Sequence, residues 1–62
     1  MKIPKKYKDK VYSFEKCDDS FNDEIGYEVS LEDGYEYCGD SLIYCDSYRD
    51  ALMVMREAEK VN

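Results

Sequence analysis

The chain has 62 residues, which allows one small domain and excludes multidomain enzymes and long solenoids. It carries 15 acidic and 9 basic residues, a net charge of −6, and no histidine. No apolar run approaches the roughly 20 residues that a membrane-spanning helix needs. The N-terminal sequence Met1-Lys2-Ile3-Pro4-Lys5-Lys6 lacks the apolar stretch of a secretory signal, so we expect a cytoplasmic protein.

The charge is distributed unevenly along the chain. Residues 1–16 hold six lysines and two acids, whereas residues 17–48 hold ten acids and no base. Residues 49–62 are balanced, with three charges of each sign. The sequence therefore predicts a basic N-terminal arm over residues 1–10, possessing no clear periodicity, and a single domain over residues 11–62 with an acidic middle.

Two segments alternate between apolar and polar residues, as strands do. In residues 11–17, Tyr12 and Phe14 face one way and Ser13 and Glu15 the other. Residues 25–32 give the cleanest alternation and predict a half-buried antiparallel strand. Residues 18–24, between these two strands, form a polar loop rich in Asp, Ser and Asn.

An Asp33-Gly34 pair after the second strand indicates a hairpin. A three-residue loop with Gly34 in the left-handed region keeps apolar residues together, because Leu31 then faces Tyr35 and Val29 faces Tyr37. A two-residue Gly39-Asp40 turn would next set Tyr37 opposite Leu42 and Tyr35 opposite Tyr44. A fourth strand is thus expected over residues 41–45.

The last segment changes to a helical period. Ser47 is the expected N-cap, with Asp50 three residues later as its capping-box partner. Ala51, Leu52, Met55 and Ala58 form an apolar stripe, with Val61 beside it and Lys60 complementing the helix dipole. The helix is thus expected to run through most of residues 46–62.

Together these elements predict an α+β fold: a small antiparallel β-meander of three to four strands, with one C-terminal α-helix packed on one face. Alternating strand positions and the helical stripe define the expected core. It comprises Tyr12, Phe14, Ile25, Tyr27, Val29, Leu31, Tyr35, Tyr37, Leu42, Tyr44, Leu52 and Met55.

Several chemistries are disfavoured by the residues present. A nucleophile such as Ser20 or Cys17 has no histidine to act as its base, and a domain this small has little room for a catalytic pocket. We therefore expect no enzymatic activity and no cofactor. Cys17, Cys38 and Cys45 lack zinc-ligand spacing, and their odd number argues for reduced thiols. The oxygen-rich loop 18–24 departs from the EF-hand pattern because Phe21 occupies a ligand position, so no metal site is expected.

Protein binding is the function that the sequence favours. The predicted outer face of the hairpin carries Glu28, Glu32 and Glu36, with Asp33 and Asp40 at its turns. Alternate residues of a strand lie roughly 6.8 Å apart on one face, so this row could imitate a phosphate backbone. We expect an acidic inhibitor that occupies the nucleic-acid-binding surface of a partner with a basic surface.

Three alternatives remain, one of them a metal-dependent role through weak calcium or magnesium association. A homo-oligomeric structural or accessory subunit would use a sheet edge or the second face of the sheet. A weak nucleic-acid binder would use the N-terminal lysines, namely Lys2, Lys5, Lys6, Lys8 and Lys10. In size, acidity and lack of a catalytic set, the chain resembles phage and mobile-element inhibitors of host nucleases, including anti-CRISPR proteins, and this resemblance rests on no sequence motif.

Overall fold

The computed structural model describes residues 3–19 and 24–61, and confirms the α+β fold class. A 3-10 helix precedes a three-stranded antiparallel sheet, one α-helix and a small second pair of strands. The elements are η1 (Lys5–Tyr7), β1 (Val11–Asp19), β2 (Glu24–Leu31), β3 (Tyr35–Glu36), β4 (Leu42–Cys45), α1 (Tyr48–Glu57) and β5 (Glu59–Lys60). Within these described ranges, no helix is long and apolar enough to cross a membrane.

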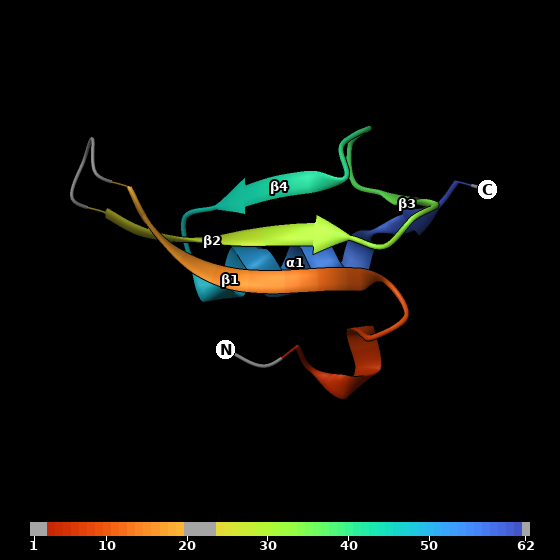
Figure 1. Ribbon diagram of the computed structural model, residues 1–62, viewed down its shortest axis with the longest axis horizontal. Helices are drawn as coiled ribbons and strands as arrows, with labels where there is room; N and C mark the ends of the chain where they lie inside the picture. Colours follow the sequence, from red (N-terminus) through yellow and green to blue (C-terminus); the bar gives the residue numbers. More distant parts are fainter. Residues whose placement is uncertain (1–2, 20–23, 62) are drawn as a thin grey trace.

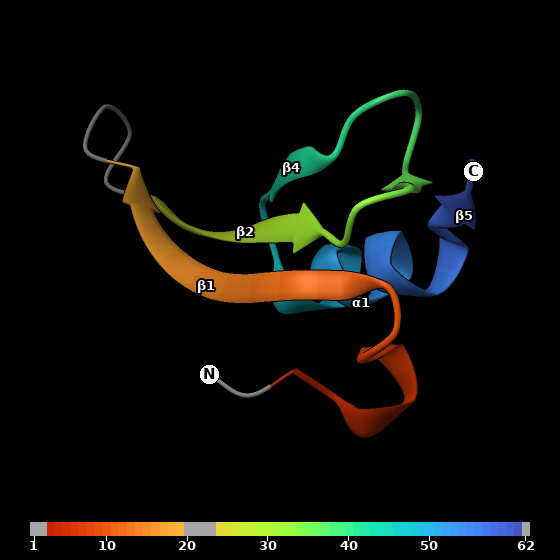
Figure 2. The same cartoon turned by 45° about the vertical axis from the view of Figure 1, so that its right-hand side comes forward.

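The main sheet has the strand order β1-β2-β4, and α1 packs across one of its faces (Figure 1). The ribbon formed by β1 and β2 extends well past the start of the helix (Figure 2). Phe14, Val29 and Ile43 are aligned across the three strands, so they share the face that meets α1. Val29 and Met55 of α1 are fully buried at the centre of this contact.

A β-bulge between Val11 and Ser13 changes which residues of β1 enter the core. Because the extra residue breaks the alternation, Val11 and Phe14 are both buried, whereas Tyr12 is 73% exposed. The predicted core is therefore wrong at Tyr12, and also at Ile25, Leu42 and Tyr44, which are exposed. Tyr7, Val11 and Cys45, which the prediction left out, are buried instead. Ala51 and Ala58 of the predicted apolar stripe are also buried, as is Val54 beside it.

The predicted hairpin pairing after β2 is wrong. Val29 faces Ile43 of β4 rather than Tyr37, and Tyr35 of β3 pairs with Lys60 of β5. Pairing β2 with β4 brings Ile43 and Cys45 to the helix face, whereas β3 would bring tyrosines whose hydroxyls need partners when buried. Gly34 does adopt a positive φ, of 90°, as expected, in a turn closed by the Tyr35 N–H on the Glu32 carbonyl at 2.9 Å.

The next turn lies one residue earlier than predicted. Its central residues are Cys38 and Gly39, and the N–H groups of Tyr37 and Asp40 donate to each other's carbonyls at 2.9 and 3.0 Å. Cys38 and Gly39 have φ values of 54° and 85°, the two positive values that define a type I′ turn. Only one of these two residues is a glycine, so Cys38 has a positive φ that residues other than glycine rarely adopt.

The helix begins where the sequence predicts and ends earlier. Ser47 is the N-cap, and its hydroxyl oxygen accepts a hydrogen bond from the Asp50 N–H at 3.1 Å. The chain leaves the helix at Ala58, which is extended, and residues Glu59–Lys60 form β5. The favourable helix propensity of this segment is overridden by its pairing with β3.

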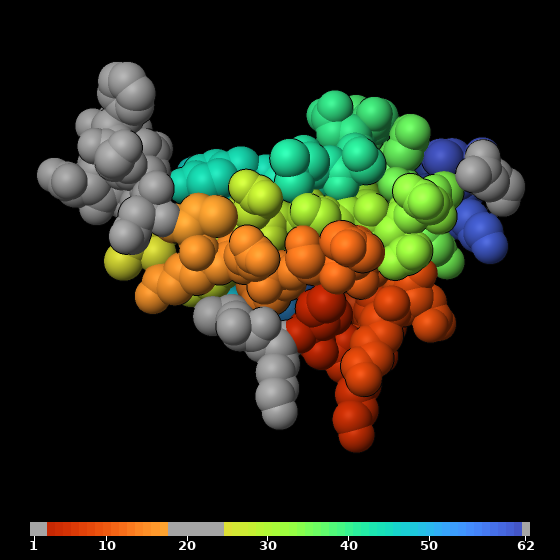
Figure 3. Space-filling view, in the orientation of Figure 1, coloured from red at the N-terminus to blue at the C-terminus, as the bar shows by residue number. Residues whose placement is uncertain are grey.

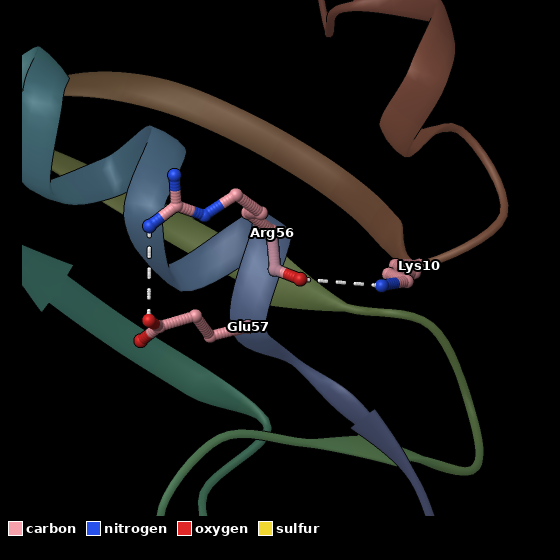
Figure 4. A network of polar contacts seen from close by, with 3 residues as sticks. All are labelled: Lys10, Arg56 and Glu57. Carbon is pink, nitrogen blue, oxygen red and sulfur yellow. Dashed lines mark hydrogen bonds and ion pairs between the residues drawn. The ribbon is translucent and has the colours of Figure 1, made fainter.

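The N-terminal segment contacts the domain from η1 onwards. Tyr7 is buried in the core. Lys10 Nζ donates to the carbonyl oxygen of Arg56 at 3.3 Å, so it satisfies a group in the last turn of α1 (Figure 4). The Arg56 guanidinium also lies 3.7 Å from the Glu57 carboxylate, an exposed pair that contributes little stability.

Candidate functional site

One face of the main sheet is not covered by the helix, and we call it the open face (Figure 3). Glu28 and every second residue of β2 point to this face, and so do the residues directly opposite them on β1 and β4, because opposed residues of antiparallel strands share a face. Its members are Ser13, Glu15 and Cys17 of β1, Gly26, Glu28 and Ser30 of β2, and Leu42 and Tyr44 of β4. Leu42 and Tyr44 are 57% and 49% exposed, so the face combines apolar area with carboxylates.

Two glutamates occupy directly opposite positions at the centre of the open face. Glu15 and Glu28 are cross-strand partners, and the third residue in this row is Tyr44. The thiol of Cys17 lies 4.0 Å from Glu28 Oε2, which places it beside the carboxylate. No described base is aligned with this row, so the two negative charges repel each other across the ladder.

A second group of carboxylates lines a depression beside the β3/β5 pair, which we call the acidic depression. It is lined by Glu36 of β3, Glu57 at the end of α1, Glu59 of β5, and by Tyr37 and Cys38. Glu36 and Glu59 are again cross-strand partners. Desolvation, followed by the electrostatic effects of Cys38 and Glu57, raises the pKa of Tyr37 above its ordinary value.

Six of the described bases line two depressions, and we call these two depressions together the basic side. Lys6 of η1 lines a depression together with Arg49 and Arg56 of α1. Lys5 and Lys8 line another one with Lys16 of β1. The fold thus adds two arginines from the charge-balanced C-terminal segment to the lysine-rich N-terminal segment, and each depression also contains one acid, Glu15 or Asp50.

The five predicted contact residues do not form one continuous row. Glu28 lies on the open face and is half-buried, whereas Glu36 belongs to the separate β3/β5 pair. Glu32 and Asp33 are exposed beyond the end of β2, and Asp40 is exposed at the Cys38-Gly39 turn. The expected alignment of Glu28, Glu32 and Glu36 on one face is therefore wrong, because β3 leaves the main sheet.

The other predicted residues have different positions. Lys5, Lys6 and Lys8 are exposed, Lys10 is half-buried, and Lys2 lies outside the described residues. The structure adds Glu15, Glu57 and Glu59, which sequence reasoning missed. The pairing of residues 11–17 with residues 25–31 could have indicated Glu15, whereas no sequence signal indicated the β3/β5 pair that brings Glu59 to Glu36.

Metal and disulfide chemistry receive no support from the described side chains. Among them, no group of three or more His, Cys, Asp or Glu residues is placed to hold a metal ion. The loop around residues 20–23, where the oxygen-rich segment was considered, lies outside the described part of the chain. Cys17, Cys38 and Cys45 form no disulfide with one another.

Comparison of the chain with protein-family models, with curated proteins and with solved structures found no match. An exposed sheet face with a carboxylate pair and apolar neighbours can bind a cationic group and the apolar stem that carries it.

Proposed function

We propose that this protein is a non-enzymatic interaction module that binds a basic surface of a partner protein. The partner is a nucleic-acid-binding protein, and the module inhibits it by occupying the surface that otherwise contacts phosphates. The open face, with Glu28 at its centre, makes the contact. Glu32, Asp33, Glu36 and Asp40 extend the negative field beyond it and steer the partner toward the face.

The observation that carries this proposal is the pairing of acids across the strands. Glu15 faces Glu28 in the main sheet, and Glu36 faces Glu59 in the small pair. A protein that used these positions only for stability would place a lysine opposite each glutamate, because like charges in direct opposition destabilise a sheet. The chain has lysines, but the strand register sets none of the described ones directly opposite these four glutamates.

A cationic partner would reverse the sign of this repulsion. An arginine or lysine inserted between Glu15 and Glu28 would interact with both carboxylates, and its stem would lie against Leu42 and Tyr44 on the same face. Each opposed pair is expected to cost roughly 0.2–1 kcal/mol in the unbound protein. Binding would remove that cost, so part of the affinity comes from relief of repulsion.

The test is an affinity capture from the native host with the immobilised protein, followed by mass spectrometry. The wild type should retain a basic nucleic-acid-binding protein, and a short duplex of DNA or RNA should displace it. Glu28→Lys should lose this capture while its Tm stays equal or rises, because the new lysine faces Glu15. The double variant E32K/E36K should weaken capture less and mainly slow association, since these residues lie outside the contact.

Asp9→Lys is the matched control, because it reverses one exposed carboxylate that lies next to the basic side. It should capture the partner as the wild type does. Equal capture by Glu28→Lys, or a retained protein that nucleic acid does not displace, would contradict the proposal. Recovery of only this same chain would favour the homo-oligomer instead.

Nucleic-acid binding remains a second candidate because of the basic side. Six bases line its two depressions, and Tyr12, which is 73% exposed, lines the same depression as Lys5 and Lys8. A basic groove with an exposed aromatic ring can hold single strands. A gel shift with single-stranded DNA that disappears in Lys5→Glu/Lys8→Glu and in Tyr12→Ala would support this function, and no shift at low salt would reject it.

A further inference from the structure

The two edges of the main sheet are protected very differently. β1 forms one edge and carries a β-bulge at Tyr12 and the exposed charges of Glu15 and Lys16. β4 forms the other edge, and its sequence Leu42-Ile43-Tyr44-Cys45 contains no charge and no proline. Its pairing with β2 is regular over all four residues. Natural proteins usually blunt a sheet edge with bulges, charges or proline, because an unprotected edge accepts further strands.

The register shows which backbone groups of β4 point away from the sheet. The Leu31 N–H donates to the Ser41 carbonyl at 2.7 Å, so Leu31 and Ser41 are a hydrogen-bonded pair. Hydrogen-bonded and non-hydrogen-bonded pairs alternate along an antiparallel ladder. Leu42, which faces Ser30, therefore directs its N–H and C=O away from β2. Its side chain is 57% exposed on the open face.

An aspartate lies at each end of β4. Asp40 precedes β4 and Asp46 follows it, and both side chains are exposed. Glu28 lies one strand further in, opposite Tyr44. A strand added beside β4 would thus meet apolar side chains along its length and a carboxylate at each end.

From these observations we propose that β4 accepts an extended segment of the basic partner as a fourth strand of the sheet. The segment alternates apolar and polar residues and has a lysine or arginine at each end. Its backbone pairs with the outward-facing groups of β4, its apolar side chains lie beside Leu42, and its terminal cations approach Asp40 and Asp46. This inference rests on the proposed function, since it specifies how the basic partner binds.

A second copy of this chain fits the same edge less well. Antiparallel pairing of two β4 strands centred on Ile43 would keep the open faces on one side. That register would set Asp40 opposite Asp46 of the other copy at both ends of the seam. Two copies of net charge −6 would then add like-charge contacts to their general repulsion.

The test measures fluorescence anisotropy of a labelled KVTVTVK peptide with the full-length protein. Two further peptides serve as controls: EVTVTVE, and KVTVTVK with N-methyl groups on the amides of one edge. KVTVTVK should bind, and the acidic and the N-methylated peptides should bind at least roughly tenfold more weakly. Such a loss corresponds to about 1.4 kcal/mol, near the value of a single backbone hydrogen bond.

Two variants test the site itself. Leu42→Pro removes the outward N–H without removing a bond to β2, so it should fold and lose roughly tenfold in affinity. Leu42→Thr keeps the N–H and should retain most of the binding. D40K/D46K should weaken KVTVTVK and strengthen EVTVTVE.

The outcomes separate the two proposals. Binding that survives Leu42→Pro and N-methylation but is lost in Glu28→Lys would overturn strand addition and leave the proposed function intact. Equal binding of EVTVTVE would overturn the charge complementarity on which both depend. No binding of KVTVTVK, or a concentration-dependent dimer that Leu42→Pro abolishes, would reject the basic segment as the occupant of this edge.

Discussion

The aromatic ring of Tyr44 lies over Gly26, diagonally across the β2–β4 ladder on the open face. A Cβ atom at residue 26 would collide with the Tyr44 hydroxyl and ring, and would lie 2.8 Å from the carbonyl oxygen of Cys45. Gly26 is thus covered by a neighbouring tyrosine, an arrangement that compensates for the missing side chain of a strand glycine. The contact also fixes the position of Tyr44 next to Glu28.

Gly26→Ala should destabilise the protein by about 1–3 kcal/mol, the usual cost of inserting a methyl group into a packed site. Thermal or urea unfolding followed by circular dichroism measures this loss. The double variant G26A/Y44A should recover only part of the stability, since the Cys45 carbonyl stays close. Ser30→Ala, on the same face and strand, is the control and should change stability little.

The two methionines of α1, Met53 and Met55, are predicted to differ in their effect on stability. Met55 is fully buried and Met53 is 38% exposed. Met55→Ala should cost about 2–5 kcal/mol because it leaves a cavity beneath the sheet. A domain of 62 residues has a total stability of roughly 3–9 kcal/mol, so this variant should be partly unfolded. Met53→Ala should stay within about 0.5 kcal/mol of the wild type in urea denaturation.

Tyr7 and Tyr12 give a test of the N-terminal segment. Tyr7 is 7% exposed, and the Lys6 ammonium lies 5.1 Å from its ring centroid. Tyr7→Ala should lower the free energy of unfolding by about 3–5 kcal/mol, as for other large buried aromatic side chains. Tyr12→Ala, which truncates an exposed ring, should have little effect. Equal stability of both variants would show that residues 3–10 do not pack as the structure places them.

Sequence patterns predicted the parts of the fold that depend on interactions between residues close together in the chain. The Ser47 cap, the positive φ of Gly34 and the strand over residues 25–31 follow from side-chain chemistry within a few residues. Local patterns could not predict which strand pairs with β2, because the sequences of β3 and β4 are both typical of strands. The choice depends on packing against α1, where Ile43 and Cys45 are accommodated.

The candidate site was predictable only in part for the same reason. Glu28 occupies the outward position that strand alternation predicts. Glu36 was expected on the same face, but the short pairing of β3 with β5 moves it to another sheet. Parity within β1 also failed, since the bulge at Tyr12 inserts a residue that no sequence pattern marks. Long-range pairings and bulges therefore decide where the carboxylates lie.

Cys45 should make stability depend on pH in the alkaline range. Burial, and then the nearby Asp50 and Asp46 carboxylates, raise the pKa of the Cys45 thiol above its ordinary value. Above the unfolded-state pKa of about 8.5, the unfolded chain loses this proton while the folded protein keeps it. Stability should thus be complete below that pH and fall as the pH rises toward the folded-state value. Tm measured from pH 7 to pH 10 should therefore decline less steeply in Cys45→Ala than in the wild type.

Cys38→Ala is the control for this prediction, because Cys38 is exposed. Its pH profile should match that of the wild type. Alkylation with iodoacetamide at pH 8 gives an independent readout: mass spectrometry should find Cys38 modified well before Cys45 in the folded protein, and both at similar rates in guanidinium chloride. If the Tm of Cys45→Ala declined with pH as steeply as that of the wild type, other groups would cause the decline. The prediction requires that Cys45 keep its proton in the folded protein at pH values where the unfolded chain has lost it.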